Sequence, residues 1–181
     1  MGTSGLGKGL DDPALDPIWK ALEANDTMLF LHPHYGLPDE AFGGPEVTES
    51  YGHVLPLALG FPLETTIAVT RMLLAGVFDR FPRLLILLAH SGGTLPFLAG
   101  RIESCIAHER KFLANGGSTP GPQRSIWDVL KTNIYLDAVV YGEAGLKAAI
   151  QASGPDRLLF GKIPTPILFL SFLIAISDFL S

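Results

Sequence analysis

The sequence predicts an α/β domain built on a parallel sheet. Short apolar stretches of strand length alternate along the chain with longer stretches in which apolar residues recur at helical spacing. This alternation is typical of βα units, whose strands lie parallel to one another. With 181 residues, of which 48% are hydrophobic, the chain is long enough to form one domain with a sizeable core.

The clearest strand lies within residues 84–93. Six consecutive apolar residues end at His90, and a Ser-Gly-Gly turn follows them. A run this short and this uniformly apolar predicts a strand that is buried on both faces. Because ligands bind at the carboxyl ends of strands in such folds, His90 stands where a ligand-binding rim is expected.

The other elements follow from the same patterns. Strands are expected at residues 28–31, 133–137 and 158–161. Helices are expected at residues 11–25, 62–81, 95–113, 126–131 and 143–152. The first helix has a clear start, because Asp12 can cap it and Pro13 suits its first turn. Residues 1–10 and the Gly- and Pro-rich residues 35–60 are expected to be loops.

Residues 162–181 break this pattern. Pro164 and Pro166 would interrupt a helix, and residues 167–176 are almost wholly apolar. A membrane span needs about 20 apolar residues, and this run is shorter. We therefore expect a domain over residues 1–161 followed by an apolar tail that does not span a membrane.

Composition excludes several classes of partner. The net charge is −5 and the basic residues are scattered, so we expect no nucleic-acid partner. Cys105 is the only cysteine, which excludes an intrachain disulfide and a cysteine-rich zinc site. Residues 1–9 lack the apolar core of a secretory signal. We expect a cytoplasmic protein with no membrane partner.

Two histidines stand at the ends of predicted strands. His32 and His90 each close an apolar run, and the carboxyl ends of parallel strands share one rim. Converging imidazoles could hold a metal ion, or divide into a ligand and an acid/base. Equally, each histidine could cap its strand by bonding a backbone carbonyl group. A metal site would also need a third or fourth ligand.

Three further side chains could belong to the same rim. His34 could line a substrate pocket or be a solvated loop residue. Arg101 could clamp a carboxylate bidentately or be an ordinary surface residue of its helix. Asp137 could bond a ligand or cap the helix that follows it.

Five motifs, taken in order, resemble the decarboxylase branch of the amidohydrolase superfamily. They are His32-Pro33-His34-Tyr35-Gly36, Gly60-Phe61-Pro62-Leu63-Glu64-Thr65-Thr66, Gly76-Val77-Phe78-Asp79-Arg80-Phe81-Pro82, Ala89-His90-Ser91-Gly92-Gly93 and Gly100-Arg101-Ile102. That branch includes the aminocarboxymuconate-semialdehyde, γ-resorcylate and 5-carboxyvanillate decarboxylases. The chain most resembles the fungal isoorotate type, over most of residues 1–161.

The resemblance implies a fold and a site. The fold is a TIM (β/α)₈ barrel of the metal-dependent hydrolase type, of which about four βα units are present here. The site holds one divalent metal, zinc or manganese, with His32 as a ligand and His90 as the catalytic residue that hydrogen-bonds the substrate or a metal-bound water. Arg101 binds the substrate from the neighbouring subunit, which implies a homodimer, and His34 is expected to contact the substrate.

The resemblance also implies an activity, the non-oxidative decarboxylation of an aromatic or heteroaromatic acid such as isoorotate or a hydroxybenzoate. Two departures from the family pattern limit this expectation. No His-x-His pair precedes His32, and Phe160-Gly161 is followed by Lys162 rather than by Thr-Asp-His-Pro. Two ligand histidines and an aspartate are thus missing. We expect this chain by itself to be an inactive fragment that does not retain the metal. Alternatives are a hydrolase on the same scaffold and a non-catalytic fragment.

Overall fold

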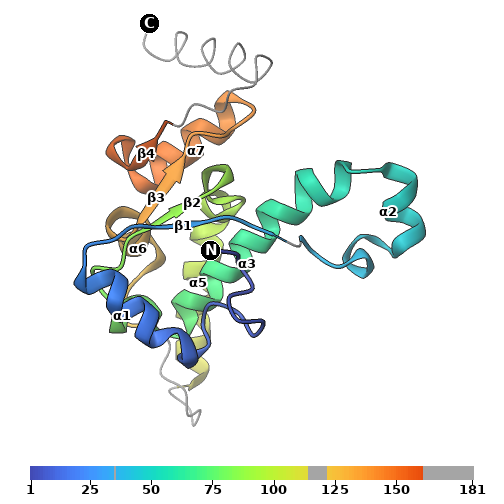
Figure 1. Ribbon diagram of the computed structural model, residues 1–181. Coiled ribbons are helices and arrows are strands. Elements are labelled where there is room, and N and C mark those ends of the chain that lie inside the picture. Colours follow the sequence, from blue (N-terminus) through green and yellow to red (C-terminus); the bar gives the residue numbers. More distant parts are fainter. Residues whose placement is uncertain (35, 114–121, 161–181) are drawn as a thin grey trace, which may run out of the picture.

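A four-stranded parallel sheet forms the centre of the protein in the computed structural model, which describes residues 1–34, 36–113 and 122–160 (Figure 1). The strands are β1 (Leu29–Leu31), β2 (Ile86–Leu88), β3 (Ile134–Asp137) and β4 (Leu158–Leu159). They lie side by side in chain order, and each pair is parallel. The predicted α/β class and all four strands are confirmed.

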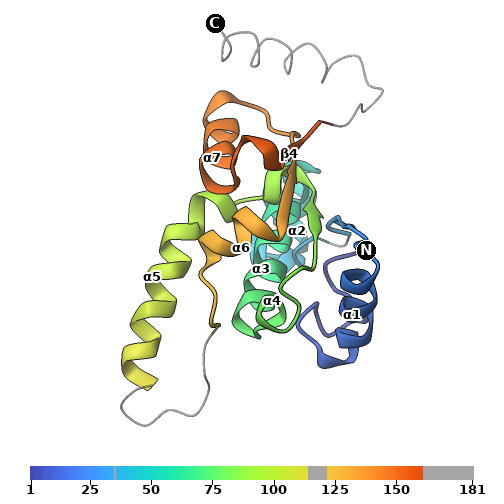
Figure 2. The ribbon, with the colours of Figure 1, turned by 90° about the vertical axis from the view of Figure 1, so that its left-hand side faces the viewer.

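Helices connect the strands. They are α1 (Asp16–Ala24), α2 (Pro45–Tyr51), α3 (Phe61–Leu74), α4 (Val77–Arg80), α5 (Leu95–Leu113), α6 (Ile126–Thr132) and α7 (Glu143–Ser153). Shorter turns of 3₁₀ helix are η1 (Pro13–Leu15), η2 (Asp39–Phe42), η4 (His90–Gly92) and η5 (Pro155–Arg157), and η3 (Pro56–Gly60) is a π-helix. Helices α5, α6 and α7 pack against one another on one side of the sheet (Figure 2).

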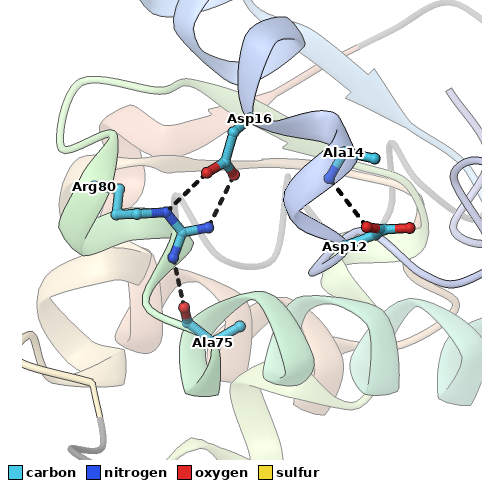
Figure 3. Close-up of polar contacts among 5 residues, drawn as sticks. All are labelled: Asp12, Ala14, Asp16, Ala75 and Arg80. Carbon is cyan, nitrogen blue, oxygen red and sulfur yellow. Dashed lines mark hydrogen bonds and ion pairs between the residues drawn. The ribbon is translucent and has the colours of Figure 1, made fainter.

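The predicted start of the first helix is confirmed. The Asp12 carboxylate accepts a hydrogen bond from the Ala14 amide at 3.0 Å, and one 3₁₀ turn, η1, leads into α1 (Figure 3). The helix is then tied to α4. Arg80 donates two hydrogen bonds to the Asp16 carboxylate, at 2.9 and 3.2 Å, and a third to the Ala75 carbonyl group (Figure 3).

The two faces of the sheet differ in burial. One face packs under the helices, and its residues Leu31, Ile86, Leu88, Ile134, Leu136 and Leu158 are buried. The other face is more open, since Phe30 is 48% exposed and Leu159 is 37% exposed. Leu87 is only partly buried. The prediction of a strand buried on both faces is therefore wrong for β2, because side chains alternate between a packed face and an open one.

The predicted loop at residues 1–10 pairs with the sheet at its start. The Met1 amino group donates to the Phe30 carbonyl at 2.8 Å, and the His32 amide donates to the Met1 carbonyl at 3.1 Å. Gly2 and His32 form a parallel bridge. The edge of β1 is thus covered by the first two residues.

Residues 35–60 were predicted to be a loop, and this is wrong for much of the segment. It contains η2, α2 and η3, and α2 projects away from the rest of the structure (Figure 1). The glycines and prolines that suggested a loop mark helix boundaries instead. Pro45 occupies the first turn of α2, and Gly44 and Gly52 flank the helix on either side.

The helix predicted over residues 62–81 is two helices. Gly76 has φ +69° and ψ +26°, a left-handed conformation that ends α3 and starts α4. Glycine adopts this conformation without the steric cost that a Cβ atom brings. The break turns α4 back so that Val77 and Phe78 are buried in the core.

One helical segment has a composition that a membrane span would also have. Among the described residues, only the helical segment Pro56–Leu74 has the length and the apolar composition that a membrane-spanning helix needs. A core helix passes the same test, and one face of α3 is buried, with Val69 and Met72 in the core. The apolar tail predicted at residues 162–181 lies outside the described part of the chain.

Candidate functional site

Strand register brings the predicted rim residues together. Leu31, Leu88 and Leu136 lie side by side across β1, β2 and β3. His32 and Asp137 each come one residue later, and His90 comes two residues after Leu88. The ring centroids of His32 and His90 are 5.0 Å apart. The two imidazoles therefore converge at the carboxyl rim of the sheet.

Two phenylalanines complete a cluster of rings around these histidines. Phe30, on the open face of β1, is 6.0 Å from the His32 ring, centroid to centroid. Phe61, the first residue of α3, lies 6.3 Å from His32 and 6.2 Å from His90, and its plane is 23° from that of His90. Phe61 belongs to the second of the five sequence motifs, but the sequence alone did not place its ring beside these histidines.

His32 is oriented by its own loop. Its Nδ1 atom lies 2.6 Å from the Pro33 carbonyl oxygen. A carbonyl oxygen can only accept, so Nδ1 carries the proton and donates. In the neutral ring with this proton placement, Nε2 has the lone pair, and the side chain is exposed. This is the tautomer in which a histidine can bind a metal ion through Nε2.

His90 opens a turn of unusual backbone geometry. His90 has φ +54° and Ser91 has φ +50°, while Gly92 and Gly93 follow with φ +76° and +66°. Positive φ is uncommon for residues with a side chain, and such residues concentrate at functional sites. The turn reverses the chain between β2 and α5, and it fixes where the His90 ring leaves the sheet.

The His90 ring is partly buried, and burial favours its neutral form. Removal from water lowers the pKa of His90 below 6.5, Asp137 opposes this shift, and nearby His32 adds to it. Its buried Nδ1 atom has no hydrogen-bond partner within the described part of the chain. A buried polar atom without a partner is uncommon, and a ligand at this rim would supply one.

Asp137 holds the turn that follows His90. Its Oδ1 atom accepts a hydrogen bond from the Ser91 amide at 2.8 Å and another from the Val139 amide at 3.2 Å. The Ser91 hydroxyl donates to the Asp137 carbonyl oxygen at 2.6 Å. Asp137 does not cap the following helix, because the N-cap of α7 is Gly142. That alternative for Asp137 is wrong, because its carboxylate points back to the β2–α5 turn.

Glu64 is a second carboxylate that the sequence did not identify as part of the site. Its Oε1 atom accepts from the Thr3 hydroxyl and, at 3.3 Å, from the His34 amide. Its Oε2 atom accepts from the Gly36 amide. Glu64 therefore links the first residues of the chain, the loop after β1 and α3. His34 is exposed on that loop, two residues beyond His32.

Arg101 lies apart from the histidines. It is exposed on α5 and lines a groove of about 410 Å³ with Thr70 and Leu74 of α3. Thr70 is nine residues along α3 from Phe61, which corresponds to about 14 Å at 1.5 Å per residue. Within this chain, the structure does not bring Arg101 to the cluster that contains His32 and His90.

The residues described here supply only part of a metal site. None of their histidine, cysteine, aspartate and glutamate side chains form a group of three or more that could hold a metal ion. His32 suits a ligand by its tautomer, and His90 is the only other imidazole described in contact with it. A catalytic zinc site needs three protein ligands. The full set is not present in this part of the chain.

Comparison with known proteins identifies the family. Residues 2–161 match the family described as Amidohydrolase. The chain is 32% identical to the 2-amino-3-carboxymuconate-6-semialdehyde decarboxylase of Dictyostelium discoideum, over 92% of the chain and 43% of that protein. It is 30% identical to a gamma-resorcylate decarboxylase of a Polaromonas species, over 80% of the chain and 42% of that protein.

Solved structures agree. Apo IDCase of Metarhizium anisopliae, an isoorotate decarboxylase, is 57% identical with a TM-score of 0.86, over 98% of this chain and 50% of that one. The 5-carboxyvanillate decarboxylase of Novosphingobium aromaticivorans, complexed with manganese, is 26% identical with a TM-score of 0.77, over 97% and 49%. The chain spans about half the length of these relatives. It belongs to the amidohydrolase family, and its sheet corresponds to part of the TIM barrel of that family.

Proposed function

We propose that this chain carries half of the active site of a metal-dependent, non-oxidative decarboxylase of an aromatic or heteroaromatic carboxylic acid. The observation that supports this most directly is the pair of imidazoles, 5.0 Å apart at the carboxyl rim, in a chain that is 57% identical to IDCase. Isoorotate is the first substrate to test, and hydroxybenzoates such as those in the names of other relatives come next.

His32 is proposed as the metal ligand of this half. Donation from Nδ1 to Pro33 holds the ring in one tautomer and leaves the Nε2 lone pair available. The family's divalent metal, which is manganese in three of the similar structures, would withdraw charge from the substrate as a Lewis acid. Zinc and manganese both accept imidazole ligands, and the choice between them is part of the test.

His90 is proposed as the catalytic residue of this half. A neutral imidazole offers one N–H donor and one nitrogen acceptor, so it can hydrogen-bond a ring oxygen or the carboxylate of the substrate. Burial favours the neutral form of the ring, since it lowers the pKa of His90. Phe61, nearly parallel to His90, would limit the space available to a planar substrate.

Arg101 and His34 are proposed as substrate-binding residues. Arg101 is exposed on α5 and away from the cluster, so it can reach a substrate only in a neighbouring subunit, which requires a homodimer. Its guanidinium group suits a carboxylate, because it can form two parallel hydrogen bonds. His34 shares the loop that Glu64 holds beside His32.

A chimera tests the proposal with a complete barrel. Residues 1–160 replace the matched half of Metarhizium anisopliae IDCase, and release of carbon dioxide from isoorotate and from 2,6-dihydroxybenzoate is measured with added zinc or manganese. We expect turnover of one of these acids. His90→Asn should lower kcat by at least about 100-fold, the usual contribution of a positioned acid–base or hydrogen-bonding group.

Hydrolysis is measured in the same chimera, with lactones and amides as substrates. Hydrolysis without release of carbon dioxide would replace the proposal with the alternative of a hydrolase. A folded, metal-loaded chimera that decarboxylates none of these acids would contradict the proposal. His108→Ala is the matched control, because His108 contacts Phe112 edge to face at the surface of α5, and this variant should keep the activity of the parent.

A further inference from the structure

We propose that Asp137 is the positioning residue of His90, and that it acts by fixing the backbone turn on which the imidazole stands. The inference rests on the proposed function only where it concerns catalysis, since the turn itself can be measured in the chain alone. In this role, Asp137 neither binds a ligand nor caps a helix. It holds in place the catalytic group that follows the neighbouring strand β2.

The geometry of the turn supports this role. His90 and Ser91 both have positive φ, at +54° and +50°, so two consecutive residues with side chains occupy the left-handed region. Such a conformation persists only when surrounding contacts impose it. Asp137 supplies such a contact from a neighbouring strand, because its Oδ1 accepts a hydrogen bond from the Ser91 amide at 2.8 Å.

A second bond closes the connection. The Ser91 hydroxyl donates to the Asp137 carbonyl oxygen at 2.6 Å. The side chain of Asp137 therefore bonds the main chain of Ser91, and the main chain of Asp137 bonds the side chain of Ser91. Both residues are well covered, since Ser91 is 3% exposed and Asp137 is partly buried. The third bond, from the Val139 amide to the same carboxylate oxygen, keeps that oxygen in position.

The carboxylate is the part of this connection that a substitution can remove cleanly. A hydrogen bond to a charged acceptor is stronger than one between neutral groups, so loss of the carboxylate should release the Ser91 amide. Release lets the turn leave its positive φ values, and the His90 ring then moves relative to Phe61 and His32. Asparagine keeps an oxygen at Oδ1, and it should preserve the turn without the charge.

The test uses NMR spectroscopy of the 181-residue chain and three variants, Asp137→Ala, Asp137→Asn and Asp79→Ala. Hydrogen exchange of the Ser91 amide and the ring signals of His90 are measured, with His90→Asn used to assign the ring. Asp79→Ala is the matched control, because the Asp79 carboxylate also accepts from two backbone amides, those of Gln123 and Arg124, at 2.9 and 3.1 Å.

In Asp137→Ala, we expect exchange of the Ser91 amide to be about tenfold faster or more, and the His90 ring signals to shift. Asp137→Asn should leave the ring signals near their positions in the parent chain. Asp79→Ala should lower stability without moving them. The proposal is overturned if Asp137→Ala leaves both readouts unchanged, if Asp79→Ala shifts the ring equally, or if Asp137→Asn behaves like Asp137→Ala.

The catalytic consequence is measured in the IDCase chimera. There, Asp137→Ala should lower kcat much more than it changes KM, and Asp137→Asn should restore most of the loss. If the chimera is inactive but the NMR results are as expected, the proposed function fails and the role of Asp137 stands. If the chimera is active and the ring does not move in Asp137→Ala, the function stands and the role of Asp137 fails.

Discussion

Gly93 occupies a position that leaves no room for a side chain. A Cβ atom there would lie 2.2 Å from the Pro62 carbonyl oxygen, and the backbone has φ +66°. Overpacking and an unfavourable backbone conformation each cost about 1–3 kcal/mol. We predict that Gly93→Ala lowers the free energy of unfolding by roughly 2–4 kcal/mol, measured by urea denaturation, because α3 and the turn after β2 must separate.

Gly100→Ala is the control for this prediction. Gly100 lies inside α5 with no positive φ, and an added Cβ atom would make only an ordinary contact with Trp127 at 3.7 Å. Alanine favours a helix over glycine by about 0.5–1 kcal/mol, so this variant should be slightly more stable than the parent. A Gly93→Ala variant as stable as Gly100→Ala would show that α3 does not approach the turn so closely.

Asn133 carries a buried polar network at the other end of the strands. Its side-chain amide donates to the carbonyl groups of Pro82 and Leu84, at 3.1 and 2.8 Å, and its oxygen accepts from Arg124 at 2.7 Å. The residue is 0% exposed. Because Asn133→Ala leaves buried partners without bonds, we predict a loss of roughly 2–4 kcal/mol in the free energy of unfolding.

Thermal denaturation can compare this variant with Asn25→Ala. Asn25 is an exposed residue at the end of α1 whose amide donates to Ala21 at 2.8 Å, and its loss should change stability by no more than about 0.5 kcal/mol. Equal effects of the two substitutions would mean that water replaces the partners of Asn133, and the buried network would then contribute little.

At the scale of elements, the pair of Arg80 and Asp16 joins α1 to α4 (Figure 3). Their side chains are 39% and 33% exposed, so solvent screens the attraction. We predict a coupling of about 0.5–1 kcal/mol in a double-mutant cycle of Arg80→Ala and Asp16→Ala, measured by urea denaturation. The bidentate geometry favours the upper part of that range.

The pair of Lys147 and Glu143 provides the comparison. It joins residues four apart on α7, and both side chains are more than half exposed. Its coupling should be about 0.3–0.5 kcal/mol. Both couplings should fall as salt is raised from 0.05 to about 1 M, since screening shortens the range of the interaction. A coupling between Arg80 and Asp16 that does not respond to salt would point to packing rather than to charge.

Also at this scale, the sequence predicted the existence of most helices and strands. It predicted their boundaries less well. Periodicity and capping residues located the four strands, the start at Asp12 and the long helix α5, because these depend on neighbouring residues. The break at Gly76 and the helices within residues 35–60 were missed. Glycine and proline serve loops and helix boundaries alike, and packing decides between the two.

At the scale of the whole molecule, only those parts of the candidate site that depend on neighbouring residues could be predicted from the sequence. A histidine at the end of an apolar run is visible in the sequence, so His32 and His90 could be placed on one rim. Glu64, Phe61 and the bond from Asp137 to Ser91 could not. They depend on contacts between residues 28–60 positions apart, which only the folded chain brings together.

The open face of the sheet determines what this chain can do alone. In a closed (β/α)₈ barrel that face is filled by layers of side chains, whereas here Phe30 is 48% exposed and Leu159 is 37% exposed. Among the described residues, His32 is the ligand that we propose, and the His90 ring lies beside it. Two imidazoles fall short of the three protein ligands that hold a catalytic zinc ion.

We therefore predict that the purified 181-residue chain retains well under one equivalent of zinc or manganese after dialysis, and that it releases no carbon dioxide from isoorotate. Metal content is measured by mass spectrometry, with Metarhizium anisopliae IDCase treated identically as the reference. Adding the unmatched half of IDCase as a separate polypeptide should raise metal retention, and His32→Ala should abolish that gain. Stoichiometric metal and turnover in the chain alone would contradict the prediction, because a site built from these two imidazoles would then suffice.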